Sequence, residues 1–256
     1  TIWPMLREWL THRMTPAPEP LKRLGYLKEQ IAIAARHRRL FPAWKEHLER
    51  SRRFVLWSAA NCPGQNKVVI LGSGGLLDVP LGDLADDFAE VVLVDIFHPP
   101  AVRAWAAQYP NVYLDEVDLT GLVDDLAQGE MPAEPPLPDL PEADADLVVS
   151  LNLMTQLPLI PARHVPEKQA KAFAAEIQRQ HLRALQALTG RVCLITETLR
   201  EFVEDGAVDE TEPALADIKL PEPDERWIWN LAPAPEIERG RDLRLRVAAY
   251  ANLFKK

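Results

Sequence analysis

A short glycine-rich segment, Gly72–Gly75, follows directly on the apolar run Val68–Leu71. Glycine at such a place allows positive φ angles and lets a ligand approach the backbone closely. Asp95 ends the next apolar run, 23 residues after Gly72. An acid about 20 residues beyond the first glycine is placed to accept hydrogen bonds from ribose hydroxyls. The loop and the acid together predict a site for a nucleotide-type cofactor.

The residues after the glycines indicate which kind of cofactor to expect. A dinucleotide site wants a third glycine where Leu77 stands, and Asp78 follows, whose carboxylate would repel a diphosphate. The sulfonium cation and ammonium group of S-adenosylmethionine would instead be favoured by Asp78. The loop therefore favours a methionine-type ligand over a phosphate-type one.

Four stretches of the sequence resemble the successive motifs of the class I S-adenosylmethionine-dependent methyltransferases, over roughly residues 66–200. They are Val68–Gly74, Val94–Asp95, Asp118–Leu119 and Asp146–Asn152. The resemblance implies that the loop Gly72, Ser73, Gly74 and Gly75 lies against the methionine part of the cofactor. It also implies that Asp95, with Ile96, holds the ribose, that Asp118 and Leu119 border the adenine, and that Ser150 to Asn152 line the boundary with the substrate.

The sequence departs from that family's pattern at two positions. An acid often stands two positions before the first glycine, where this chain has Ile70, and the third loop glycine is replaced by Leu76. Asp78 is placed to compensate for the missing acid. The departures leave open a catalytically inactive cofactor-binding or protein-interaction module. A nicotinamide-dependent reductase is a third alternative, disfavoured by Leu77 and Asp78.

Candidates for the substrate pocket follow the later apolar runs. Asn152 and Gln156 come after Asp146–Leu151, and Glu197 comes after Val192–Thr196. Ligands gather at the carboxyl ends of a parallel sheet, although a polar residue that merely begins a loop is an equal alternative for each. Methyl transfer needs mainly alignment of the nucleophile, so no catalytic residue is assigned.

Histidines offer fewer candidates. His98 lies three residues beyond Asp95 and is a pocket candidate, although Pro99 and Pro100 suggest that it chiefly fixes a loop. His181 falls on a helical apolar stripe and is expected to be buried and hydrogen-bonded, whereas His37 and His47 are expected at the surface. No spacing resembles a metal site, and no Gly-Lys-Ser/Thr loop occurs.

The elements that must position these residues read as an α/β fold. The five apolar runs, at 68–71, 91–94, 112–114, 146–151 and 192–196, predict buried parallel strands. Helical patterns lie between them, at 101–109 and 166–188. Alternating segments at 226–231 and 243–250 predict an antiparallel pair at one edge. We therefore expect a seven-stranded, mostly parallel Rossmann-like sheet with an antiparallel edge pair.

The chain divides into a helical N-terminal cap, residues 1–60, and a Rossmann-like methyltransferase domain, residues 61–256. The cap is expected to help cover the substrate, with a new helix beginning at Pro42. Aromatic residues interleave with basic ones there and favour core over a lid or a partner-binding patch. They are Phe41, Trp44, Phe54 and Trp57. Residues 129–141 hold five prolines and predict an extended surface linker.

The composition of the chain limits the classes of protein to which it can belong. With 256 residues, 47% of them hydrophobic, the chain can bury one large core, and no apolar stretch is long enough to predict a membrane span. The start lacks a secretory pattern, and two unclustered cysteines fit the cytoplasm. A net charge of −9 disfavours nucleic acid and favours a small molecule or a protein as methyl acceptor. The basic segment 36–53 and the acidic segment 201–225 are expected to be solvated surface.

Overall fold

A mixed sheet forms the centre of the computed structural model, which describes residues 8, 10–141 and 144–254. The strands are β1 (Lys67–Leu71), β2 (Glu90–Asp95), β3 (Val112–Glu116), β4 (Leu147–Leu151), β5 (Arg191–Glu204), β6 (Ala207–Pro213), β7 (Glu225–Ala232) and β8 (Arg241–Tyr250). The helices are α2 (Glu19–Leu24), α3 (Tyr26–Ala60), α4 (Leu81–Asp87), α5 (Pro100–Ala106), α6 (Val123–Gln128) and α7 (Glu167–Gln186), with the 3₁₀ helix η1 at Pro161–His164.

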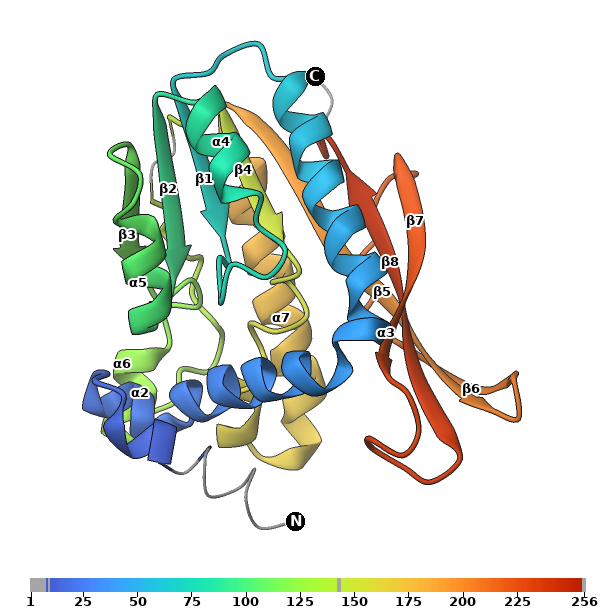
Figure 1. Cartoon of the computed structure of the whole chain (residues 1–256). Coiled ribbons are helices and arrows are strands. Elements are labelled where there is room, and N and C mark those ends of the chain that lie inside the picture. The colour runs from blue at the N-terminus through green and yellow to red at the C-terminus, as the bar shows by residue number, and fades with distance from the viewer. Residues whose placement is uncertain (1–7, 9, 142–143, 255–256) are drawn as a thin grey trace.

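The strand order is β3-β2-β1-β4-β5-β8-β7, with β6 beside the outer half of β5 (Figure 1). Neighbours from β3 to β5 are parallel, and β8 is antiparallel to both β5 and β7. The predicted α/β fold, its seven strands and its antiparallel edge pair are therefore confirmed. The sheet has one strand more than expected, because β5 runs on far beyond residue 196 and pairs there with β6.

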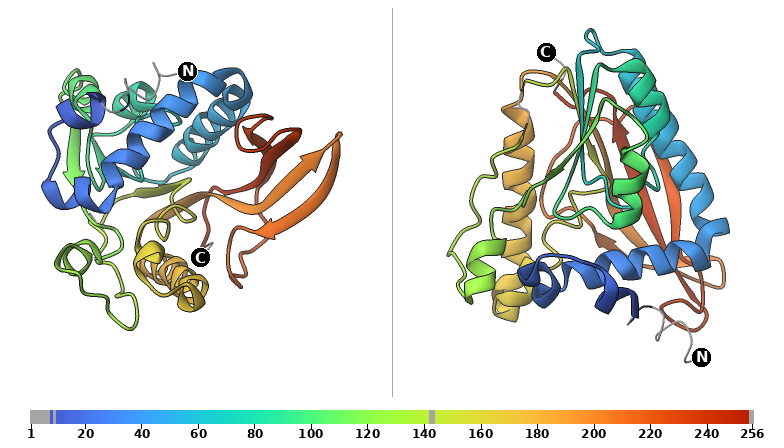
Figure 2. Two further views of the ribbon diagram at one scale, coloured as in Figure 1. Left: turned by 90° about the horizontal axis from the view of Figure 1, so that it is seen from below. Right: turned by 60° about the vertical axis from the view of Figure 1, so that its left-hand side comes forward.

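Helices cover both faces of the sheet, as Figure 2 shows in its right-hand view. Alternate strand residues face opposite sides, so Ile70 packs with α3, α4 and α5 on one face, whereas Leu71 packs with α7 on the other. The central strands are buried on both faces and consist almost wholly of aliphatic residues. The predicted helix at 166–188 is confirmed as α7, which begins after Pro166.

Helix α3 bends at Leu40, where φ is −108° and ψ is 17°, and the predicted new helix at Pro42 follows the bend. The second half of α3 packs along β7, and the first half crosses below the carboxyl ends of the parallel strands (Figures 1 and 2). Trp44 and Phe54 are buried in the core as expected, but Phe41 and Trp57 are about half exposed. The part of the helical prediction that concerns residues 1–7 and 9 lies outside the described residues.

An apolar cluster fastens this first half of α3, with α2, to the rest of the molecule. It joins Leu21 and Leu27 to residues of α6 and α7, among them Leu126 and Ile177, and to Ile160, which directly precedes η1. Hydrogen bonds add to it: Gln30 Nε2 donates to the carbonyl of Phe97, at 2.8 Å. We call α2 together with residues 26–39 the lid.

The remaining segments agree with their sequence patterns. Residues 130–141 form no helix or strand, as the proline run predicts. No described helix is long and apolar enough to cross a membrane.

Candidate functional site at the carboxyl ends of the sheet

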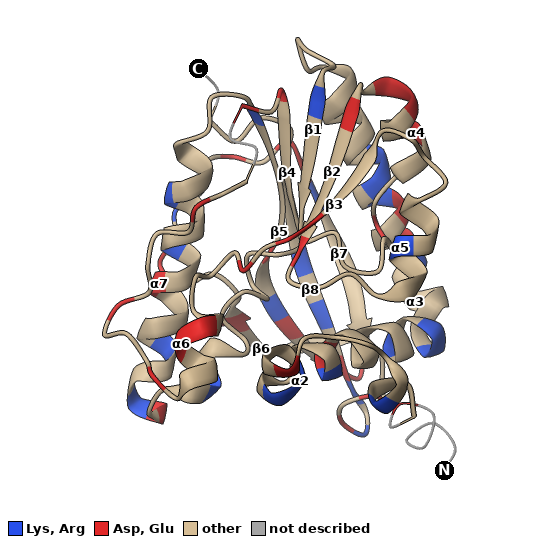
Figure 3. Cartoon of the chain, turned by 90° about the vertical axis from the view of Figure 1, so that its left-hand side faces the viewer, with Lys and Arg blue, Asp and Glu red and all other residues tan. Residues whose placement is uncertain are grey.

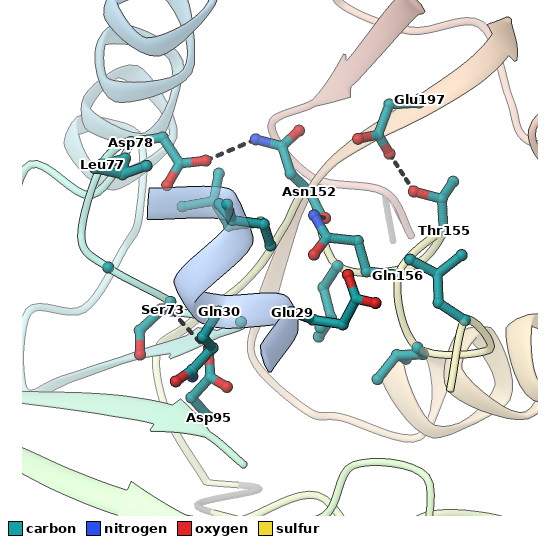
Figure 4. A pocket seen from close by; sticks show the side chains of 18 of the residues that line it. Glu29, Gln30, Ser73, Leu77, Asp78, Asp95, Asn152, Thr155, Gln156 and Glu197 are labelled. Carbon is teal, nitrogen blue, oxygen red and sulfur yellow. Dashed lines mark hydrogen bonds between the residues drawn. The ribbon is translucent and has the colours of Figure 1, made fainter. Parts of the chain in front are cut away.

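The strand order reverses between β1 and β4, because β2 and β3 lie to one side of this pair and β5 lies to the other. Connections leaving the two strands diverge at such a point and leave a crevice outside their carboxyl ends. A cavity of about 360 Å³ lies there, between the strand ends and the lid (Figure 4). Twelve of the thirteen residues expected from the sequence line it, namely Gly72, Ser73, Gly74, Gly75, Asp78, Asp95, Ile96, Asp118, Leu119, Asn152, Gln156 and Glu197.

The glycine loop turns sharply at the end of β1. Gly72 has a φ of +80° and Gly74 a φ of +49°, and a Cβ on Gly72 would meet Leu153 at 3.0 Å. Leu76 takes the place of the third glycine, yet it adopts a φ of +59° and is buried. The backbone therefore keeps a glycine-like bend at Leu76 without a glycine there.

Asp95 holds this loop in place. Its Oδ2 accepts the backbone N–H of Gly74 and its Oδ1 accepts that of Ile96, both at 2.7 Å. Burial raises the pKa of the Asp95 carboxyl, and the two N–H groups oppose that shift. Each carboxylate oxygen has a further lone pair, so this side chain can still accept hydrogen bonds from a ligand. Its role toward a ribose stays a prediction.

Asp118 is engaged in its own loop. One oxygen accepts from the backbone and hydroxyl of Thr120, and the other accepts the backbone N–H of Val123, at 2.7 Å. The carboxylate thus satisfies free donors at the start of α6. Leu119 beside it is buried and offers an apolar wall to the cavity.

Two side chains that line the cavity are bonded to each other. Asp78 Oδ2 accepts from Nδ2 of Asn152 at 2.7 Å, as Figure 4 shows. Asn152 has a φ of +48°, an uncommon conformation that asparagine tolerates better than most residues. Burial raises the pKa of the Asp78 carboxyl, while the Asn152 amide opposes the shift. Asp78 and Asn152 thereby link the glycine loop to the segment after β4.

Glu197 lies on the far side of Asn152, on β5. It is buried, and its Oε2 accepts from the hydroxyl of Thr155 at 2.5 Å. Burial raises the pKa of the Glu197 carboxyl. Gln156 is exposed at the cavity rim and donates to the carbonyl of Asn152.

His47 is one expectation that proved wrong. It is only 1% exposed rather than at the surface, and it lines the cavity. Its Nδ1 accepts from Nε1 of Trp227 at 3.0 Å, its Nε2 lies 3.3 Å from Nδ2 of Asn152, and its ring stacks on Trp229. Burial lowers the pKa of His47 to about 3, so the ring is neutral near pH 7.

His98 does not line the cavity. It is buried, and its Nε2 lies 3.2 Å from the carbonyl oxygen of Asp115, beside β3. His181 is buried as expected, with Nε2 2.9 Å from the hydroxyl of Ser150. Across the described ranges, no group of three or more His, Cys, Asp or Glu is placed to hold a metal ion.

The sequence reasoning assigned no cavity role to several further residues that line it. From the lid these are Tyr26, Glu29, Gln30, Ile33 and Arg36, and elsewhere they include Trp44, Thr155, Arg200, Trp229, Leu231 and Leu245. The spacing of Trp227 and Trp229 is a sequence signal for an aromatic strand face, since alternate positions of a strand share a face. No comparable sequence feature indicated that the lid residues line the cavity.

Buried polar atoms around the cavity offer a test of whether it suits a polar ligand. Among the described residues, six buried atoms of lining side chains have no hydrogen-bond partner: Tyr26 Oη, Gln30 Oε1, Arg36 Nε, Ser73 Oγ, Asn152 Oδ1 and Trp229 Nε1. An unsatisfied buried polar group is costly, so such a cluster is expected where a bound molecule completes the bonding. The residues present thus fit a polar ligand that both donates and accepts hydrogen bonds.

Comparisons with known proteins find only distantly similar structures. No family model and no curated protein matches the sequence. One similar solved structure is Burkholderia thailandensis 1,6-didemethyltoxoflavin-N1-methyltransferase with 1,6-didemethyltoxoflavin and S-adenosylhomocysteine, at 14% identity, 92% coverage of both chains and a TM-score of 0.41. Another is the N-methyltransferase NodS of Bradyrhizobium japonicum WM9 with S-adenosylhomocysteine, at 16% identity. The match covers 82% of this chain and 88% of that chain, with a TM-score of 0.39.

A third similar structure is the 23S rRNA methyltransferase ErmE, at 15% identity, with 80% of this chain and 70% of that chain covered and a TM-score of 0.32. Because these TM-scores lie below 0.5, the similarities carry no argument for function. The argument must come from the site.

Proposed function

We propose that this chain is an S-adenosylmethionine-dependent methyltransferase. The observation that carries the proposal is the cavity at the reversal of strand order, where a glycine loop, Asp78 and Asp95 face one space beneath the lid. Acidic side chains predominate around it: Glu29, Asp78, Asp95, Asp118 and Glu197 line it, against Arg36 and Arg200. This excess of carboxyl groups favours a cationic ligand.

The path of the chain after the loop argues against a dinucleotide. A diphosphate binds best where a helix N-terminus directly follows the glycines. Here α4 begins only at Leu81, after the buried residues Leu76 and Val79, and Asp78 lies between them. A carboxylate stands where a diphosphate would need N–H donors.

Each part of the site has a task under this proposal. Asp95 would hold the ribose of S-adenosylmethionine, the glycine loop would lie against its methionine part, and Asp78 would face its ammonium group. The cofactor would supply an activated methyl group on a sulfonium. The chain itself contributes alignment, because the lid and strand ends hold two molecules in one enclosed space and exclude water.

Binding of S-adenosylhomocysteine tests the cofactor assignment. At about 100 times its dissociation constant, a ligand stabilises the folded protein by roughly 2.7 kcal/mol, which thermal unfolding detects. We expect S-adenosylhomocysteine to raise the melting temperature and NAD to leave it unchanged. Stabilisation by NAD alone would contradict the proposal and favour a reductase.

A matched pair of variants locates the site. Asp95→Asn removes the charge and one acceptor of the loop, so we expect S-adenosylhomocysteine affinity to fall by at least about tenfold, equivalent to 1.4 kcal/mol. Asp87→Asn, on the exposed end of α4, is the control and should bind like the wild type. Equal affinity in both variants would refute the role of Asp95.

An assay of product formation distinguishes an enzyme from an inactive binding module. The wild-type chain is incubated with methyl-labelled S-adenosylmethionine and a small-molecule extract, and transfer of label into extract components is measured. Tight binding without transfer would leave the binding-module alternative as the better description.

A further inference from the structure

The cavity extends away from the glycine loop toward β5, β7 and β8. Four residues define this end: Trp44 from α3, His47 one turn later, Trp229 from β7 and Glu197 from β5. We call them the aromatic–acidic pocket. Sheet order separates it from the strand ends of β2 and β3, and the Asp78–Asn152 bond lies between.

The aromatic part of this pocket is rigid and presents ring surfaces. His47 stacks on Trp229 with ring centroids 3.9 Å apart and planes 2° apart, and Trp44 meets Trp229 edge-on at 5.1 Å and 82°. The indole N–H of Trp44 is already bonded to the carbonyl of Leu231 at 2.8 Å. Rings held in this way select flat ligands, because stacked and edge-to-face aromatic pairs gain energy beyond the area they bury.

The acidic part is a single carboxyl group. Glu197 is 4% exposed, and Thr155 occupies only its Oε2, so Oε1 remains able to accept from a ligand. Leu231 and Leu245 complete the lining with apolar surface. Nε1 of Trp229 is buried without a hydrogen-bond partner. A molecule that matched this end would therefore be flat and largely apolar, with one hydrogen-bond donor for Glu197 and one acceptor for Trp229.

Size restricts the molecule further. The whole cavity measures about 360 Å³, near the lower bound for ligand sites, and the proposed cofactor must share it. The lid, joined to α6 and α7 through its apolar cluster, covers the same space. Little room remains for a folded partner or for duplex nucleic acid.

We infer that the aromatic–acidic pocket binds a planar aromatic small molecule, which stacks against the Trp229–His47 wall and donates an N–H or O–H hydrogen to Glu197. This inference rests on the proposed function, since the molecule would be the methyl acceptor.

Three related probes test it: 3-aminoquinoline, which is flat and has a donor; quinoline, which lacks the donor; and 2-decalol, which is neutral and has a hydroxyl donor but no aromatic ring. Affinities are measured by calorimetry on the full chain saturated with S-adenosylhomocysteine. We expect 3-aminoquinoline to bind at least about tenfold more tightly than either relative, as one desolvated hydrogen bond to a charged group allows.

Variants separate the two recognition elements. Glu197→Gln removes the carboxyl group and leaves one acceptor oxygen where there were two, so it should reduce the preference for 3-aminoquinoline over quinoline. Trp229→Leu should weaken both flat probes together. Glu204→Gln, exposed at the far end of the same strand, is the control and should change nothing.

The outcomes are distinguishable from failure of the proposed function. If S-adenosylhomocysteine does not bind the wild type, the proposed function fails. If it binds normally but 3-aminoquinoline shows no binding, or binds no better than 2-decalol, the acceptor inference is wrong and the proposed function stands. Unchanged preference in Glu197→Gln would likewise overturn the inference.

Discussion

His47 illustrates how a side chain's neighbours in sequence can mislead. Basic residues surround it along the chain, which suggested solvent, yet it shares a helix face with Trp44, Ser51 and Phe54. That helical spacing was a sufficient signal for burial. The same argument placed His181 correctly, because its neighbours on α7 are visibly apolar. What no spacing could supply is the partner, since Trp227 comes from a strand 180 residues away.

Other roles at the residue scale depend on contacts that only the fold creates. The glycine loop and Asp95 were predictable, because a short motif and a strand end determine them. The bond between Asp78 and Asn152 spans 74 residues and has no local signature. Asp118 was expected at the adenine, and its carboxylate also bonds the backbone N–H of Thr120 in its own loop and that of Val123, the first residue of α6.

The buried His181 makes stability depend on pH. Burial lowers its pKa from 6.5 to about 4, so between these values the unfolded chain binds more protons than the folded one. Stability due to this residue is therefore complete above pH 6.5 and is lost as pH falls toward 4, by about 2 kcal/mol between pH 7 and pH 5.

Urea unfolding of the wild type and His181→Gln at both pH values measures this effect. Glutamine can keep a hydrogen bond to Ser150 but does not titrate, so the stability difference between the two proteins should shrink by about 2 kcal/mol at pH 5. His164→Gln, an exposed control, should follow the wild type. A constant difference would show that His181 titrates normally. The comparison cancels the buried carboxyls, whose raised pKa values act in the opposite direction.

At the scale of elements, the sequence predicted those that depend on runs of apolar residues. All five parallel strands and both edge strands were found, because burial on two faces or one leaves a plain pattern. β6 was missed since all of its residues are exposed and many are acidic. It is a strand because β5 offers it an unpaired edge beyond β4, which is a consequence of tertiary structure.

The lid should be separable from the core in stability. Leu27, at 3% exposure, belongs to the apolar cluster that joins the lid to α6 and α7, and its replacement by alanine removes about 2–5 kcal/mol of packing. We expect Leu27→Ala to speed hydrogen exchange in residues 19–39 and to accelerate S-adenosylhomocysteine release, with β1, β2 and β4 still protected.

Hydrogen exchange with mass spectrometry and stopped-flow dissociation provide the two readouts. Leu137→Ala is the control, since Leu137 is 59% exposed on the proline-rich segment. Uniformly faster exchange across the sheet would mean that Leu27 supports the whole fold rather than the lid.

Many charged side chains of the molecule form ion pairs with one another. In the basic segment 36–53, ion pairs join Arg36 and Arg39 to Glu236, Lys45 to Glu49 and Arg50 to Glu46. In the acidic segment 201–225, they join Glu201 to Arg246, Asp209 and Glu210 to Arg241, and Glu212 to Arg200. Figure 3 shows basic and acidic residues on both the α7 side and the α4–α5 side of the sheet. Neither segment therefore presents a continuous surface of unpaired charges of one sign.

This pairing predicts weak contact with nucleic acid. A protein of net charge −9 whose basic segment is largely paired gains little from releasing counterions. We expect a fluorescein-labelled single-stranded RNA of about 20 nucleotides to bind more weakly than the 10⁻⁴–10⁻⁶ M typical of non-specific binders at physiological salt. Fluorescence anisotropy at several salt concentrations measures this. A micromolar dissociation constant that weakens steeply with salt, and is lost in Arg38→Gln with Arg53→Gln, would instead make the exposed side of α3 an RNA-binding surface.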